Sequence, residues 1–449
     1  MKKNGFTLIE VLAIIIVLSI IAVITIPIVL NVLEDSKRNT IHNSSYGYGD
    51  AVHKFSLSLL TDGIHDDGLD GSYTVSELKS MGLKVQGKEP DDGIIFYDED
   101  GVSGCIRFDE YVSFLHNGDV VDTVKGSCPN EEIVSSGTGL YKSSAADGSL
   151  VYRGNVLNNY IALKEDGTNE VLYRIVSYEP DGTIKVVRNE SIGLYARDIR
   201  TSVTEGPRKN SSNSFCNYDL DDKGEWYGCN VWGDQSSTFY NGSLMSDGFY
   251  YSYYANNSLT SLTNTLSGSV TIPSSLNTFL NSKVLNDSNS WQGLVYLDKY
   301  IDEHLFNVGG LYYHNQGYDG GVKGLAMEKQ EESLLKWKGK VGLVNITDYV
   351  EASIDSRCSS VWEAYYWNGT LSSSDIPCSS DNWMNGIVGF TLTANPYNRS
   401  SVWLIGTDSR IIDIASIRER NVFPTFYLKA GISLSGTGAV DDPYRIENI

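Results

Sequence analysis

The hydrophobic pattern of the chain is dominated by one long apolar segment near its start. Between residues 6 and 33, Glu10 is the only charged side chain. The other polar residues of the segment are Thr7, Ser19, Thr25 and Asn31. At about 1.5 Å per residue, a helix of this length reaches roughly 42 Å, more than the about 30 Å of a bilayer's hydrocarbon core. The pattern therefore predicts a helix that can cross a membrane.

The flanks of this segment indicate an anchor rather than a cleaved signal peptide. Lys2 and Lys3 precede the apolar run, and positive charge is retained on the cytoplasmic side. The polar boundary at residues 31–37 lacks a small-x-small cleavage site. We expect a single-pass protein in the cell membrane, with a cytoplasmic N-terminus and the remaining residues outside the cell.

Glu10 is not explained by anchoring alone. An unpaired acid near the start of a membrane helix costs about 3 kcal/mol on insertion scales, so it requires a partner. A free amine at Phe6, four positions earlier, would supply that partner on the same or a neighbouring chain. Such an amine is created by a cut between Gly5 and Phe6.

The junction resembles that of the type IV prepilin family, in which a short basic leader precedes a motif and an apolar helix. The motif here reads Gly5-Phe6-Thr7-Leu8-Ile9-Glu10. The resemblance implies cleavage after Gly5 by a membrane aspartyl prepilin peptidase, N-methylation of Phe6, and alignment of filament subunits by Glu10. Pro27 agrees with it, because a proline inside a helix removes a hydrogen bond and favours a kink. The simpler alternative is a signal anchor with an incidental glutamate.

The pattern after the membrane boundary predicts a pilin-like head. Apolar residues at helical spacing extend the spine helix over residues 6–60, and Gly47 and Gly49 predict a break or bend near residues 43–50. Thr74 and Glu77 have capping-box spacing, and Gly82 is placed to end that short helix. Short strands at residues 93–97, 104–108, 112–115 and 120–124, with turns at Asp100-Gly101 and Asn117-Gly118, predict an antiparallel meander within a head of residues 61–128.

The rest of the chain predicts a second, larger domain. Residues 129–139 are polar and glycine-bearing, which is typical of a linker. Residues 140–449 predict a β-rich α+β domain with long loops, and the chain as a whole is expected to be α+β. Strands are expected at residues 159–163, 171–178 and 183–188, and a helix after Pro273. A small pilin has no such domain, so this chain departs from a bulk filament subunit.

Landmarks of this region resemble a recurring surface-protein domain of Gram-positive bacteria. They are Tyr173-Arg174-Ile175, a Trp337-x-Gly339-Lys340-x-Gly342-Leu343 block, Pro424-x-Phe426-Tyr427-Leu428-Lys429 and Asp441-Asp442-Pro443-Tyr444. Such domains are similar to C-type-lectin-like or formylglycine-generating-enzyme-like folds. The resemblance implies a mixed α+β fold with long irregular loops.

The six cysteines form three local pairs in sequence, which are Cys105 with Cys128, Cys216 with Cys229, and Cys358 with Cys378. In an extracellular region, sequential pairing would give three disulfides, each stabilising by about 2–4 kcal/mol. Other connectivities stay open. None of the spacings is typical of a zinc site.

Charge and motifs exclude several functions. The net charge of −21 provides no basic stripe for nucleic acid. The sequence has no His-Glu-x-x-His helix, Gly-x-Ser-x-Gly elbow or phosphate-binding loop. We therefore expect no catalytic residues, no metal and no cofactor, and not an enzyme. Aromatic side chains near the cysteine loops are the candidates for binding a glycan or a surface protein, with core packing as the alternative. The four tryptophans singled out are Trp226, Trp232, Trp362 and Trp367.

These patterns predict a secreted pilin-like subunit that rests in the membrane and is then assembled into an extracellular pilus with other pilin subunits. The large domain favours a minor or tip-located adhesive subunit. One alternative is a priming pilin or pseudopilin that binds only other pilins, and another is a surface enzyme displayed on the pilus.

The processing prediction can be checked on the mature protein. Mass spectrometry of the chain isolated from its filaments should show methylated Phe6 at the N-terminus, because cleavage after Gly5 exposes that amine. An N-terminus at Met1 would contradict the prepilin interpretation.

Overall fold

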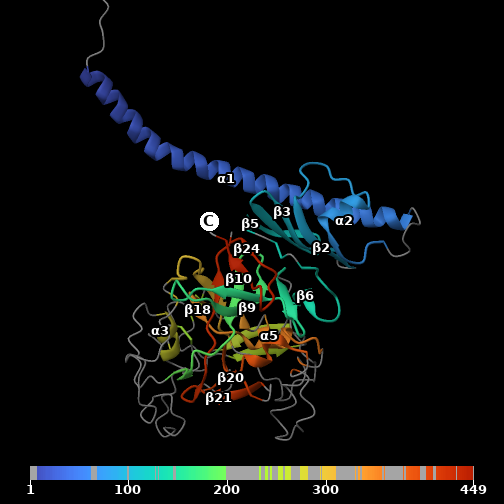
Figure 1. Cartoon of the computed structure of the whole chain (residues 1–449), viewed down its shortest axis with the longest axis vertical. Helices are drawn as coiled ribbons and strands as arrows, with labels where there is room; N and C mark the ends of the chain where they lie inside the picture. Colours follow the sequence, from blue (N-terminus) through green and yellow to red (C-terminus); the bar gives the residue numbers. More distant parts are fainter. Residues whose placement is uncertain are drawn as a thin grey trace, which may run out of the picture.

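The chain folds into a long helix, a small sheet and a larger β-rich body. The computed structural model describes residues 8–61, 68–98, 101–126, 128–129, 131–144, 148–198, 232–233, 238–240, 243–244, 251–255, 258–263, 274–281, 294, 296–309, 329, 332–333, 336–355, 358, 378, 381–394, 401–407, 411–430 and 432–447. Helix α1 lies along one side of the small sheet, and the larger body lies on the other side (Figure 1).

Helix α1 is continuous from Leu8–Thr61. The break predicted near residues 43–50 is therefore wrong. Gly49 is buried against the sheet, where an added Cβ would lie 3.1 Å from Leu115 Cδ2. The glycine thus permits close approach of helix and sheet rather than ending the helix. Pro27 also lies inside α1, whose N-terminal half is curved (Figure 1).

The head is a five-stranded antiparallel meander in the order β1-β2-β3-β4-β5. Its strands are β1 (Gly71–Thr74), β2 (Asp92–Asp98), β3 (Gly101–Phe108), β4 (Tyr111–His116) and β5 (Asp119–Lys125). The four expected strands are present, whereas the short edge strand β1 was not expected. Asn117 and Gly118 both have positive φ, at 52° and 88°, which fits a type I′ hairpin turn.

Helix α2 (Val75–Ser80) has the predicted capping box, in which the Thr74 side chain accepts the N–H of Glu77 and the Glu77 carboxylate accepts the N–H of Thr74. Gly82 follows with a φ of 105°, and its N–H donates to the Lys79 carbonyl. The N–H of Leu83 donates to the Leu78 carbonyl, which completes a Schellman ending.

The distal body is organised around a seven-stranded sheet in the order β18-β23-β10-β9-β7-β6, with β8 also paired to β9. These strands are β6 (Gly139–Lys142), β7 (Leu150–Arg153), β8 (Tyr160–Leu163), β9 (Val171–Tyr178), β10 (Ile184–Arg188), β18 (Val341–Gly342) and β23 (Thr425–Leu428). The sheet brings together three of the four sequence landmarks. The fourth joins its edge, since the N–H of Tyr444 donates to the Tyr160 carbonyl.

Smaller elements surround this sheet. The helical ones are α3 (Ser275–Asn281), α5 (Ile346–Glu351) and η5 (Trp383–Gly386). The remaining strands are β11 (Leu194–Ala196), β12 (Thr238–Tyr240), β13 (Ser243–Leu244), β14 (Tyr251–Ala255), β15 (Ser258–Thr263), β16 (His304–Asn307), β17 (Lys336–Gly339), β19 (Phe390–Ala394), β20 (Ser401–Ile405), β21 (Ile411–Ala415), β22 (Glu419–Asn421), β24 (Leu434–Ser435) and β25 (Arg445–Ile446). The described residues are thus mixed helix and mostly antiparallel strand, as expected for an α+β chain.

The segment predicted as a linker is anchored to the head at Ile133, whereas its residues 132 and 135–138 are exposed. Ile133 is buried, and its N–H donates to Ser72 Oγ on β1. The N–H of Val134 donates to the Leu140 carbonyl. Because of these contacts, residues 129–139 connect the two parts without separating them.

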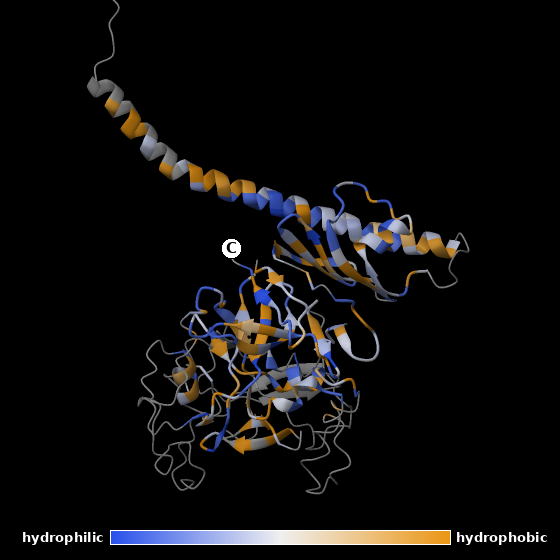
Figure 2. Cartoon of the chain, in the orientation of Figure 1, coloured by the Kyte–Doolittle hydropathy of each residue, from blue (hydrophilic) through white to orange (hydrophobic). Residues whose placement is uncertain are grey.

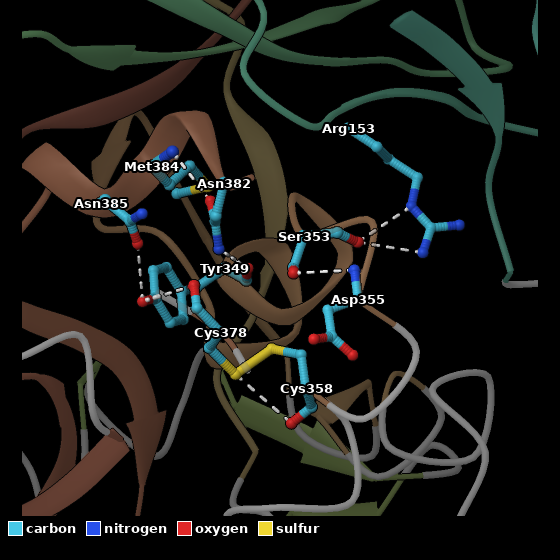
Figure 3. The surroundings of a disulfide bond; sticks show 9 residues. All are labelled: Arg153, Tyr349, Ser353, Asp355, Cys358, Cys378, Asn382, Met384 and Asn385. Carbon is cyan, nitrogen blue, oxygen red and sulfur yellow. Dashed lines mark hydrogen bonds between the residues drawn. A yellow bond between two sulfur atoms is a disulfide. The ribbon is translucent and has the colours of Figure 1, made fainter. Parts of the chain in front are cut away.

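Two of the three expected cysteine pairs are bonded in the structure. Cys105 in β3 is joined to Cys128, and Cys358 to Cys378. Around the second bridge, the hydroxyl of Tyr349 lies 3.3 Å from the Cys378 carbonyl oxygen and 3.1 Å from Asn385 Oδ1 (Figure 3). The pair predicted for Cys216 and Cys229 lies outside the described residues.

The two glycines of α1 give a matched test of the helix–sheet contact. Gly47→Ala should stabilise the head by about 0.5–1 kcal/mol, because alanine favours helix and the added Cβ meets no described atom within 4 Å. Gly49→Leu should destabilise it by about 1–3 kcal/mol, because the side chain must displace Leu115. Hydrogen exchange of the β4 amides measures both effects locally. Equal protection in both variants would contradict this packing.

Candidate functional site

The N-terminal half of α1 is an exposed apolar surface. Every described side chain from Leu12 through Thr40 is exposed. The large apolar ones are between 51% and 73% exposed, and they are Leu12, Ile15, Ile16, Val17, Val23, Ile26, Ile28, Val29, Leu30, Val32 and Leu33. Hydrophobic colour dominates this part of the helix in Figure 2. A contiguous apolar surface of this kind is typical of a protein or membrane contact.

Ion pairs mark the place where α1 meets the sheet. Glu34 is paired with Lys125 at 2.6 Å, and Lys37 donates to Glu110 at 2.9 Å. The next residue, Arg38, donates to the Thr123 carbonyl on β5. The hydrogen bond from Lys37 lowers the pKa of Glu110. Exposed pairs contribute little stability individually, but these set the register of the helix on the sheet.

Further along α1, after the ion pairs, hydroxyl groups connect the helix to the sheet. Ser45 Oγ donates to Ser113 Oγ at 2.7 Å, and Ser113 Oγ lies 2.8 Å from Thr123 Oγ1. His42 Nδ1 lies 3.1 Å from the same threonine oxygen. Satisfied polar groups in a packed interface favour one alignment over others, so the apolar half of α1 projects from the head in a defined direction.

Of the predicted processing and assembly residues, Glu10 and Pro27 belong to the described helix α1. Gly5 and Phe6 lie outside the described residues. Because α1 begins at Leu8, Glu10 lies in its first turn. Among the residues that the structure describes, no helix has the combined length and hydropathy of a membrane span.

The predicted aromatic ligand sites receive no support from the one tryptophan that can be placed. Trp232 is 1% exposed. Its ring lies edge-on to Trp337 with centroids 6.0 Å apart, and the Arg197 guanidinium lies over it at 5.3 Å. It is therefore part of the core rather than of an exposed surface. Trp226, Trp362 and Trp367 lie outside the described residues.

A buried charged cluster lies between β10 and α5. Lys185 Nζ donates to Asp348 Oδ2 at 2.6 Å, and the two side chains are 5% and 12% exposed. Nearby, the Glu332 carboxyl accepts hydrogen bonds from the hydroxyls of Thr347 and Thr393. Burial raises the pKa of Glu332 to about 7. Sequence reasoning missed this cluster, because Lys185 and Asp348 are 163 positions apart and belong to no common motif.

Other buried charges have structural partners. Glu351 pairs with Lys329 and also accepts the N–H of Ser144 at 2.8 Å. The Arg174 guanidinium donates to Asn159 Oδ1 and to the Val156 carbonyl, and it lies 4.8 Å from the Trp383 ring centroid. These contacts tie the loops after β7 and β18 to the central sheet. Groups of ligands suited to a metal ion are absent from the described part of the chain.

His304 packs against the central sheet. Its ring stacks on Tyr427 with ring centroids 3.6 Å apart, and its Nδ1 lies 3.2 Å from Asp302 Oδ2. Burial lowers the pKa of His304. The ring is packed against β23, which favours a structural role.

Two hollows adjoin the junction of head and distal body. One of about 120 Å³ is lined by Asp92, Arg107 and Tyr444, and one of about 320 Å³ lies beside α2 and is lined by Thr74 and Lys79. Both border Cys128 and Pro129. The larger is at the low end of the volumes usual for ligand sites, so neither indicates a substrate cavity.

Comparison with known proteins bears on the N-terminus. A family model described as the prokaryotic N-terminal methylation motif matches residues 1–26. Comparison with curated proteins found no match, and comparison with solved structures found none either. The chain therefore carries a type IV prepilin-like N-terminal motif, which supports a pilin-like subunit. The comparisons identified no relative of the distal body.

The buried Glu332 should make stability depend on pH. The pKa of Glu332 is about 7 in the folded chain, against 4.5 for an unperturbed glutamate. Between these two pH values the folded state therefore holds more protons than the unfolded state. Stability contributed by this group is therefore lost as pH rises through that window, by about 3 kcal/mol at most. Glu332→Gln should flatten this dependence in urea unfolding, whereas exposed Glu447→Gln should not. Parallel profiles for wild type and Glu332→Gln would contradict it.

Proposed function

We propose that this protein is a minor or tip-located subunit of a type IV pilus, which presents its distal body for adhesion or surface recognition. The observation that supports the proposal most directly is the pairing of an exposed apolar half-helix with a large body on the far side of the head. The methylation motif at residues 1–26 is consistent with this role, since it implies a prepilin peptidase and other pilin subunits as partners.

The apolar half of α1 needs an apolar environment. Its described large apolar side chains are between 51% and 73% exposed, so water would otherwise cover them. Before assembly the bilayer would provide that environment, with the N-terminus on the cytoplasmic side. After assembly the helices of neighbouring subunits would provide it, and Glu10 would pair with the Phe6 amine of a neighbour.

The distal body favours a terminal position in the filament. It is fixed to the head by packed residues, so it cannot swing away to make room for lateral neighbours. A subunit at the tip has free space beyond it, whereas every subunit of the shaft is surrounded. The same rigid attachment suits adhesion, because a load on the distal body passes directly to the head.

The location can be tested on sheared filaments. Immunogold labelling against the distal body should place gold at filament ends, because the body is accommodated there. Gold along the whole shaft would contradict a tip or minor role. A priming pilin without adhesive function would also label at ends, but its removal would abolish filaments rather than only their attachment to surfaces.

Incorporation should depend on the acid in the first turn of α1. Glu10→Ala should reduce the amount of this chain in sheared filaments by about tenfold or more, because one lost charged contact in an apolar setting corresponds to about 1.4 kcal/mol or more. Asp35→Ala is the matched control on the same helix beyond the apolar segment, and it should assemble normally. Immunoblotting of filament and membrane fractions measures both. Normal assembly of Glu10→Ala would contradict the filament role of Glu10.

A further inference from the structure

The buried pair Lys185–Asp348 is placed for covalent chemistry. Lys185 is the second residue of β10, and Asp348 lies in the first turn of α5. The distance from Lys185 Nζ to Asp348 Oδ2 is 2.6 Å. Both side chains are almost fully buried. Removing two charges from water is costly, and an ion pair recovers that cost only with good geometry and further hydrogen bonds. An uncharged product from the same two groups would avoid the cost.

We propose that Lys185 and Asp348 form an intramolecular amide bond that joins β10 to α5.

The reaction balances without any external reagent. A bond forms between Lys185 Nζ and Asp348 Cγ, and the bond from Cγ to one carboxyl oxygen breaks. The ammonium group gives up two protons, which leave with that oxygen as water, and the positive and negative charges disappear together. No electron transfer or cofactor is involved. Lysine is a competent nucleophile when it is desolvated and deprotonated.

The surroundings hold the acceptor carboxyl in position. Asp348 Oδ2 accepts the N–H of Asn345 at 2.7 Å as part of the capping box of α5. If this oxygen remains as the amide carbonyl, the cap is retained and Oδ1 is the oxygen that leaves. The Lys185 ammonium lies 5.6 Å from the Tyr427 ring centroid, on the neighbouring strand β23. The lysine thus approaches from a rigid sheet and the carboxyl from a capped helix turn.

Glu332 holds the turn that carries Asp348. Its carboxyl accepts hydrogen bonds from the N–H and the hydroxyl of Thr347, the residue before Asp348. The hydroxyl of Thr393 on β19 donates to the same carboxyl. We assign Glu332 as a positioning residue for the bond.

The chain offers a comparison pair that lacks this arrangement. Lys329 and Glu351 also form a buried ion pair. There, Glu351 accepts three additional hydrogen bonds from Ser143 and Ser144, whereas Asp348 accepts one, from the N–H of Asn345. This pair is the internal control for an ordinary salt bridge.

Intact-mass spectrometry tests the proposal directly. The full chain, purified in detergent with its disulfides reduced and alkylated, should be lighter than its sequence by one water molecule. A tryptic digest should contain a branched peptide that joins the segment around Lys185 to the segment around Asp348, with no cleavage after Lys185. A full-mass wild-type chain that is cleaved after Lys185 would overturn the proposal, whatever the behaviour of the variants.

Variants then assign the residues. Lys185→Arg and Asp348→Ala should both have the full mass, whereas Lys329→Arg should still be one water short. Glu332→Gln, which preserves shape, should reduce the cross-linked fraction at least tenfold, and Glu332→Asp should restore part of it. Restoration by the carboxyl variant would show that the effect comes from the carboxyl that holds Thr347, and not from a general loss of stability. Complete cross-linking in Glu332→Gln would overturn the role of Glu332.

Discussion

The structure depends on burial of the head sheet on both faces. Side chains along its strands alternate between two cores. In β2, Ile95 and Tyr97 point to the helix side, whereas Ile94 and Phe96 belong to the core shared with the distal body. Helix α1 therefore covers one face and the distal body covers the other (Figure 1). Because neither face is left to solvent, the sheet is the common support of both partners.

This arrangement explains why the sequence of the head departs from simple alternation. Strand β2 contains the consecutive apolar run from Ile94 to Tyr97, and β4 is buried at nearly every position. A sheet that covers only one helix should alternate apolar and polar residues. Consecutive apolar residues indicate two buried faces, so the signal for a packed distal body was present in the sequence.

Local features were predictable, and contacts between distant segments were not. The Thr74–Glu77 cap, the Asn117-Gly118 turn and the hairpin of β9 and β10 depend on neighbouring residues, so sequence reasoning identified them. Gly49 was misinterpreted because it packs against Leu115, which lies in β4, far along the sequence. The Lys185–Asp348 pair and the position of Trp232 depend on tertiary packing in the same way. Trp232 was a candidate for ligand binding, with core packing as the alternative, because its burial leaves no local pattern.

The placement of the first disulfide connects these observations. Cys105 lies in β3 between Ile94 and Phe114 on the neighbouring strands, on the face shared with the distal body. Its partner Cys128 lies just beyond β5, where the chain leaves the head. A load on the distal body would otherwise reach the head through residues 129–139 and the edge strand β5, which could be peeled from the sheet. The bridge carries that load to an interior strand instead, where hydrogen bonds on both sides and packing on both faces resist it. In the proposed tip role, this path from distal body to sheet to helix would carry the load of a bound surface ligand.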